Sequence, residues 1–232
     1  MKEVPALPKI VVYYKDAQPE PGINIRINDA EATLADLLQA WQPLCDDKTL
    51  FKTYAADNHA SCRGCTVNCC NTAYVIPDII AFKKMADYLQ LSYQEFMASR
   101  FQADKLAVGL PRMKADPCTF LQDNICAIYP LRSLICRFYI CAPLSGPTEQ
   151  LVYSLAWTGS TATILLLEQQ GLLSRRADAG LSSMDMLFQG LMEEYRHKPQ
   201  AELFLQAREY SDIPLVPFLD QYSAVLLEPS ED

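Results

Sequence analysis

Residues 62–70 read Cys62-Arg63-Gly64-Cys65-Thr66-Val67-Asn68-Cys69-Cys70, which places four cysteines in a short run of otherwise polar loop sequence. Two cysteines separated by two residues can turn both sulfurs toward one centre, and Gly64 lets the backbone between them bend tightly. Because Cys69 and Cys70 are adjacent, we expect their side chains to diverge. One of them would then join Cys62 and Cys65, while the other reaches a second centre or packs.

A second group of cysteines lies further along the chain, at gaps of 7, 9 and 4 residues: Cys118, Cys126, Cys136 and Cys141. These gaps lack the Cys-x-x-Cys knuckle of a zinc ribbon, but they suit ligands from a hairpin and from the turn after it. The two groups together make eight candidate metal ligands. Eight thiolates supply one four-cysteine site with spares or two complete sites, and the spacing does not choose between them. The ninth cysteine, Cys45, falls on an apolar stripe, where we expect a buried, inert thiol.

Composition narrows the class of protein. The chain has 232 residues, with 28 acidic and 20 basic side chains and a net charge of -8, which disfavours binding to nucleic acid or to an anionic membrane. We find no apolar run near the roughly 20 residues that span a bilayer and no secretory signal, so we expect a cytoplasmic protein. In that reducing compartment, clustered thiols bind metal more often than they form disulfides.

The local patterns predict an α+β fold that is predominantly helical, with small β-hairpins. The segments 10–14 and 23–27 read as one hairpin. The segments 118–121 and 125–129, around the polar turn 122–124, read as a second hairpin. We interpret residues 1–232 as a single domain that contains a cysteine-rich metal-binding region at 59–141 and a helical C-terminal part at 147–228.

Helical periodicity and capping signals place the helices. Apolar spacing predicts helices at 34–45, 78–89, 149–170 and 200–210, the third ended by Gly171. Asn28 with Glu31 resembles a capping box for the first helix, and Ser92 with Glu95 forms one for a further helix. A helix after Ser182 carries an apolar stripe that we expect to pack in the core: Met184, Leu187, Phe188, Leu191, Met192 and Tyr195.

The residues alone leave the identity of the metal open, since all-thiolate sites suit both zinc and iron–sulfur clusters. The two ferredoxin spacings and the Cys-x3-Cys-x2-Cys motif of radical enzymes are absent. Arg63, Arg132 and Arg137 lie beside the thiols and would offset their negative charge. No phosphate-binding glycine loop, zinc-protease motif or nucleophile elbow is present, so no catalytic residue is assigned.

The cysteine order resembles that of the YkgJ-type cysteine-cluster family, which is described as zinc- or iron-chelating. The residues that carry the resemblance lie between His59 and Cys141: Cys62-x2-Cys65, Cys69-Cys70, Pro117-Cys118-x-Phe120-Leu121, Cys126-x-Ile128-Tyr129-Pro130, Arg132 and Cys136-Arg137. Three residues precede the Cys69-Cys70 pair where the family has two, and Cys141 lies outside the family pattern. The resemblance implies that the other seven candidate cysteines include the ligands.

A related branch, the flagellin lysine N-methylases, implies a [4Fe-4S] cluster and methyl transfer from S-adenosylmethionine. On that basis we expect a [4Fe-4S] cluster with a structural or redox role, and a redox or protein partner. The alternatives are a structural zinc-binding interaction module and a lysine N-methylase-like enzyme.

Overall fold

The computed structural model describes residues 7–15, 22–47, 49–50, 53, 69–71, 73–176 and 180–227. Within these ranges the chain is α+β and predominantly helical, as predicted. The strands are β1 (Ile10–Lys15), β2 (Gly22–Ile27), β3 (Leu121–Gln122) and β4 (Ile125–Cys126). The helices are α1 (Leu34–Cys45), α3 (Ile79–Tyr88), α4 (Tyr93–Arg100), α5 (Ala103–Ala107), α6 (Leu134–Phe138), α7 (Gly146–Gln169), α8 (Ser183–Arg196) and α9 (Gln200–Gln206). Single 3-10 turns are η1 (Cys69–Asn71), η2 (Tyr129–Leu131), η3 (Tyr210–Asp212), η4 (Val216–Phe218) and η5 (Ser223–Leu226).

The first hairpin forms as predicted. Strands β1 and β2 pair antiparallel from Ile10↔Ile27 to Lys15↔Gly22. The alternating residues Ile23, Ile25 and Ile27 are buried, because period-two alternation puts them all on the face of the hairpin that packs on α1 and α7.

The cap of α1 differs from the sequence-based prediction. Thr33, and not Asn28, is the N-cap: its side chain accepts a hydrogen bond from the Asp36 N–H, and the Asp36 carboxylate accepts one from the Thr33 N–H. Asn28 instead donates its side-chain amide to the carbonyl of Pro8. The predicted capping box was wrong because the pair Asn28 and Glu31 and the pair Thr33 and Asp36 lie within a few residues of each other. Only Thr33 immediately precedes the first helical residue.

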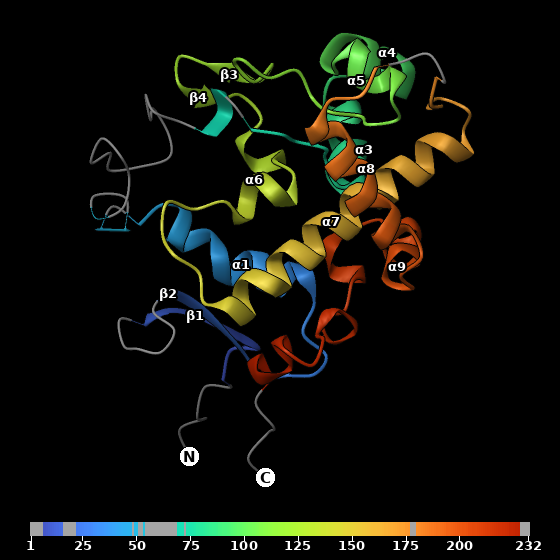
Figure 1. The fold of residues 1–232 in the computed structure, drawn as a ribbon. Helices are drawn as coiled ribbons and strands as arrows, with labels where there is room; N and C mark the ends of the chain where they lie inside the picture. Colours follow the sequence, from blue (N-terminus) through green and yellow to red (C-terminus); the bar gives the residue numbers. More distant parts are fainter. Residues whose placement is uncertain are drawn as a thin grey trace, which may run out of the picture.

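The long helix α7 runs through the middle of the molecule, between α1 and the first hairpin on one side and α3 and α8 on the other (Figure 1). Its first half, including Leu151 and Leu155, packs in one hydrophobic core with α1. Its second half, including Ile164 and Leu167, packs in another core with α3 and α4. Of the helices in the described ranges, α7 included, none is long and apolar enough to cross a membrane.

Close approach of the helices depends on one glycine of α7. A Cβ placed on Gly159 would lie 2.6 Å from the Cβ of Asp78 and 3.0 Å from the ring of Phe204. The absent side chain therefore lets α3 and α9 pack directly against the α7 backbone.

The helix hairpin formed by α3 and α4 supports the second core. The predicted capping box at Ser92 and Glu95 is present. Three aromatic rings meet behind it, with centroids 5.3 Å apart for Phe82–Phe96 and 5.2 Å apart for Phe96–Phe101. Such tilted and edge-on contacts stabilise an aromatic core.

The apolar stripe of α8 packs only in part as predicted, since Phe188 and Leu191 contact the second core but Met184 and Leu187 do not. Met192 and Tyr195 are buried, but Met184 and Leu187 are 53% and 66% exposed. The inward face instead includes Asp185, which is buried and binds the Lys105 ammonium at 2.8 Å. This ion pair requires Asp185 to point into the protein. Met184 and Leu187, which lie one position before and two positions after it on the helix, therefore turn outward.

Candidate metal centre

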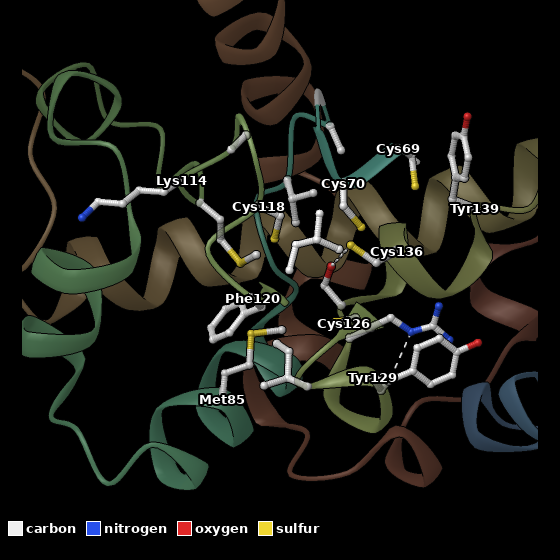
Figure 2. Close-up of a pocket in the computed structure, with 18 of the residues that line it drawn as sticks. Cys69, Cys70, Met85, Lys114, Cys118, Phe120, Cys126, Tyr129, Cys136 and Tyr139 are labelled. Carbon is white, nitrogen blue, oxygen red and sulfur yellow. Dashed lines mark hydrogen bonds between the residues drawn. The ribbon is translucent and has the colours of Figure 1, made fainter. Parts of the chain in front are cut away.

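A single pocket gathers every candidate ligand that the structure describes. Six cysteines line it: Cys69, Cys70, Cys118, Cys126, Cys136 and Cys141. They come from η1, the β3–β4 hairpin with the segment just before it, α6 and the segment after α6. The cavity has a volume of about 90 Å³. Cys62 and Cys65 lie outside the described residues. In Figure 2 the sulfurs of Cys70 and Cys136 point toward each other, and Cys69 lies on the side of Tyr139.

A backbone hydrogen bond joins the last cysteine of the first sequence group to the first cysteine of the second group. The Cys118 N–H donates to the carbonyl of Cys70 at 2.8 Å, although 48 positions separate them in the chain. Cys69 and Cys70 share one turn of 3-10 helix, and a hydrogen bond joins their side chains. The predicted divergence of this adjacent pair is therefore wrong, since the tight turn keeps both sulfurs at the same pocket.

The second hairpin presents Cys126. Leu121 pairs with Cys126, and Asp123 and Asn124 both have positive φ, 49° and 58°. Two consecutive positive φ angles are those of a type I′ turn, which suits a two-residue hairpin loop. The strands are shorter than predicted because the Cys118 N–H bonds to η1 and not across the hairpin.

The helix that carries Cys136 is anchored at its N-terminus by Asp78. The Asp78 carboxylate accepts hydrogen bonds from the Leu134 N–H at 2.8 Å and from the Ala81 N–H at 3.0 Å. It also accepts one from the Tyr210 hydroxyl at 3.1 Å. One buried carboxylate thus joins the first turns of α3 and α6. Sequence analysis placed Asp78 only at a helix start, because nothing local indicates its bond to a residue 56 positions away.

The thiols of the pocket influence one another electrostatically. Burial, helped by the nearness of Cys118 and Cys70, raises the pKa of Cys136 to about 12, although a hydrogen bond from Ser133 acts to lower it. Burial also raises the pKa of Cys118 and of Cys126. The hydrogen bond with Cys69 is the main cause that lowers the pKa of Cys70 to about 7. Thiols crowded in this way ionise together only when a cation compensates their charge, as a bound metal does.

Cys45 lies apart from this group. It is 3% exposed, belongs to the core around α1, and donates its thiol to the carbonyl of Arg137 at 3.5 Å. Burial raises its pKa. The expected buried position of Cys45 is confirmed.

An apolar wall and buried positive charge complete the pocket. Five apolar side chains from separate segments line it beside the sulfurs: Val75, Met85, Met113, Phe120 and Ile128. Phe120 and Ile128 belong to the cysteine motif of the sequence, whereas no motif indicated Val75, Met85 or Met113, which only the packing of the chain brings here. Arg132 also lines the pocket and is 8% exposed. Lys114 lines it too, but Figure 2 shows its amine directed away from the cysteines.

Within the described ranges, no three His, Cys, Asp or Glu side chains already stand in the arrangement of a single bound ion. A tetrahedral zinc with Zn–S bonds of about 2.3 Å draws its sulfurs to about 3.8 Å from one another. The described sulfurs by themselves do not form a preorganised site of that size.

Comparison with known proteins identifies the cysteine region. Residues 61–154 match the family model CxxCxxCC, described as "Putative zinc- or iron-chelating domain". No curated protein and no solved structure matches the chain. This match confirms the resemblance predicted from the order of the cysteines.

Proposed function

We propose that the zinc- or iron-chelating domain of this chain holds a [4Fe-4S] cluster in the cysteine pocket, with a structural or redox role. The observation that carries this proposal is the convergence of all six described candidate ligands, from four separate segments, on one pocket that excludes Cys45. The eight candidate ligands are those of the two sequence groups. Cys70, Cys118, Cys126 and Cys136 form the central set, since their charges act on one another.

The residues of the pocket fit such a group. The donors are all cysteine sulfurs, which suit zinc and iron–sulfur centres and not the hard cations Mg²⁺ and Ca²⁺. A buried guanidinium, that of Arg132, lies among the lining residues and compensates thiolate charge. Negative ligands beside buried positive charge are the electrostatic arrangement that a thiolate-rich centre needs.

The size and lining of the pocket favour a cluster over a single zinc ion. The cavity has a volume of about 90 Å³, which is more than a single metal ion fills. Four thiolates close tightly around one zinc ion and leave no such space, whereas a cluster brings its own sulfides to fill it. Apolar side chains line this space, and a hydrophobic surrounding limits solvent access and tunes the redox potential of a cluster.

Each part of the chain has a defined task in this proposal. The thiolates hold the centre, the side chains of Val75, Met85 and Phe120 exclude water, and Asp78 fixes the helix that carries Cys136. A bound [4Fe-4S] cluster supplies one-electron transfer or a rigid crosslink between distant segments.

Anaerobic purification of the full chain tests the proposal. We expect a brown protein that contains iron and acid-labile sulfide in equal amounts, about four of each per chain as the cluster formula requires. A colourless protein with stoichiometric zinc would overturn the cluster in favour of the zinc module. Calorimetry with S-adenosylmethionine and the metal-loaded chain tests the methylase-like alternative.

Matched variants test the ligand assignment. Cys118→Ser and Cys126→Ser should lose most of the iron, because a hydroxyl is a poor ligand for a soft metal site. Cys45→Ser is the control, since it changes a buried cysteine of the same chain that does not line the pocket. Equal iron loss in Cys45→Ser and Cys118→Ser would contradict the assignment.

A further inference from the structure

Arg132 is a buried charge whose surroundings in the described structure do not neutralise it. The residue is 8% exposed, and a guanidinium stays protonated in proteins. None of the ion pairs among the described residues includes it. A buried charge is costly unless a partner compensates it, so this position calls for an anionic group nearby.

The contacts of Arg132 fix its guanidinium while leaving one nitrogen available. Its Nε donates to the carbonyl of Tyr129 at 3.0 Å, and its Cζ lies 3.5 Å from the centre of the Tyr129 ring. Its Nη2 is buried and has no hydrogen-bond partner among the described residues. The guanidinium also interacts with the Cys45 thiol. The side chain is therefore held by the Tyr129 carbonyl, by stacking on the Tyr129 ring and by Cys45, while its Nη2 keeps an unused N–H donor among the described residues.

The position of Arg132 relates it to the sulfurs on either side. It follows η2, between the hairpin that carries Cys126 and the helix that carries Cys136, and it lines the same pocket. Burial raises the pKa of both thiols, and the charge of Arg132 acts against that rise. The pocket thus contains crowded sulfurs and one buried cation that reaches them.

We propose that Arg132 is the counter-cation of the metal centre, and that its free N–H donates a hydrogen bond to a sulfur of the bound centre. This inference rests on the proposed function, and it assigns Arg132 a positioning role and not that of a ligand. A donor and a positive charge beside an iron–sulfur centre stabilise the more negative, reduced state. Arg132 therefore raises the reduction potential of the cluster and strengthens retention of the metal.

The variants for the test are matched in charge and location. Arg132→Met removes the charge and the donors while keeping an apolar stem, and Arg132→Lys keeps the charge without the planar donor group. Lys114→Met is the control, because it removes a pocket-lining cation that is exposed and donates to the Ser99 carbonyl at 2.8 Å. Its charge is screened by water.

The experiment uses the full chain, loaded anaerobically with ferrous iron and sulfide. Spectroelectrochemical titration gives the midpoint potential, and competition with EDTA gives the retention of iron. In Arg132→Met we expect a more negative midpoint potential and about 10- to 100-fold weaker retention, the usual effect of losing a partner behind the ligands. In Arg132→Lys the midpoint potential and the iron retention should lie between those of Arg132→Met and the wild type. In Lys114→Met both should equal the wild-type values.

The outcomes separate the inference from the proposed function. If the chain binds zinc and not iron, the cluster is wrong, while EDTA competition for zinc still tests Arg132 with the same variants and the same expected loss. If Arg132→Met keeps the wild-type midpoint potential and metal retention, the counter-cation role is overturned whichever metal is bound. The role is also overturned if Arg132→Met and Lys114→Met lose metal to the same extent and Arg132→Lys restores none of it.

Discussion

Replacement of Asp78 tests whether one buried carboxylate supports both the fold and the metal centre. Asp78 is 1% exposed, and it accepts hydrogen bonds from the Ala81 N–H, the Leu134 N–H and the Tyr210 hydroxyl. These bonds join α3 to α6, the helix that carries Cys136. Asp78→Ala should therefore lower both the free energy of unfolding and the metal content.

The size of the effect follows from these contacts. Asp78→Ala leaves two buried backbone N–H groups without acceptors, and each such group costs about 1–3 kcal/mol. Removal of a buried carboxylate offsets part of this cost. We expect a net loss of about 3 kcal/mol, which lowers the melting temperature by about 6–12 °C for a chain of this size. Asp78→Asn keeps the shape but presents its NH₂ group to one of the donors, so it should lose about half as much.

The assay is thermal unfolding of the metal-loaded protein under anaerobic conditions, with iron measured after gel filtration. Asp87→Ala is the control, because Asp87 is an exposed aspartate near the other end of α3. It should change the stability by no more than about 0.5 kcal/mol. If Asp78→Ala melted like the wild type and kept its metal, Asp78 would not be the anchor of α6.

Further predictions address the core, pH dependence and the control cysteine. Gly159→Ala places a Cβ 2.6 Å from that of Asp78. We expect urea unfolding to give a free energy of unfolding about 1–3 kcal/mol lower, with a parallel loss of metal. Wild-type stability would contradict the close approach of the helices. Burial raises the pKa of Asp185, but hydrogen bonds from Lys105 and Ser182 outweigh it and hold the pKa at about 2. Since this pKa is below the unfolded value of about 3.9, the stabilisation is present above pH 4 and is lost as the pH falls toward 2. In Asp185→Asn the free energy of unfolding should not show this dependence between pH 2 and 5. At pH 7 it should be about 2–3 kcal/mol lower than in the wild type. Cys45→Ala should keep its full metal content and lose about 1 kcal/mol in thermal melts, and metal loss would place Cys45 at the centre. Leu187→Gln should change the free energy of unfolding by about 0.5 kcal/mol or less, because Leu187 is exposed. A large decrease in that free energy would show that Leu187 packs in the core after all.

Local signals predicted the elements that local chemistry decides. Ser92 and Glu95 sit three residues apart before a helix, and the capping box that they form needs no distant partner. Gly171 ends α7 with φ +69°, a conformation that glycine adopts without strain. The Asp123-Asn124 turn likewise follows from residues that tolerate positive φ.

Where distant partners decide, sequence reasoning was incomplete. The inward face of α8 depends on Lys105, which lies 80 positions before Asp185. The apolar wall of the cysteine pocket includes Val75, Met85 and Met113, which no motif links to the cysteines. Arg132 was identified as a compensating charge, but its burial and free nitrogen are visible only in the folded chain.

The amino-acid sequence by itself determined that this protein is a predominantly helical, cysteine-rich chain whose residues 61–154 match a zinc- or iron-chelating family model, because that match depends on the identity and order of the cysteines. The tertiary structure decided which sulfurs meet and what surrounds them. A ligand set is a property of residue types, whereas its convergence, charge compensation and exclusion of water depend on contacts between segments far apart in the chain.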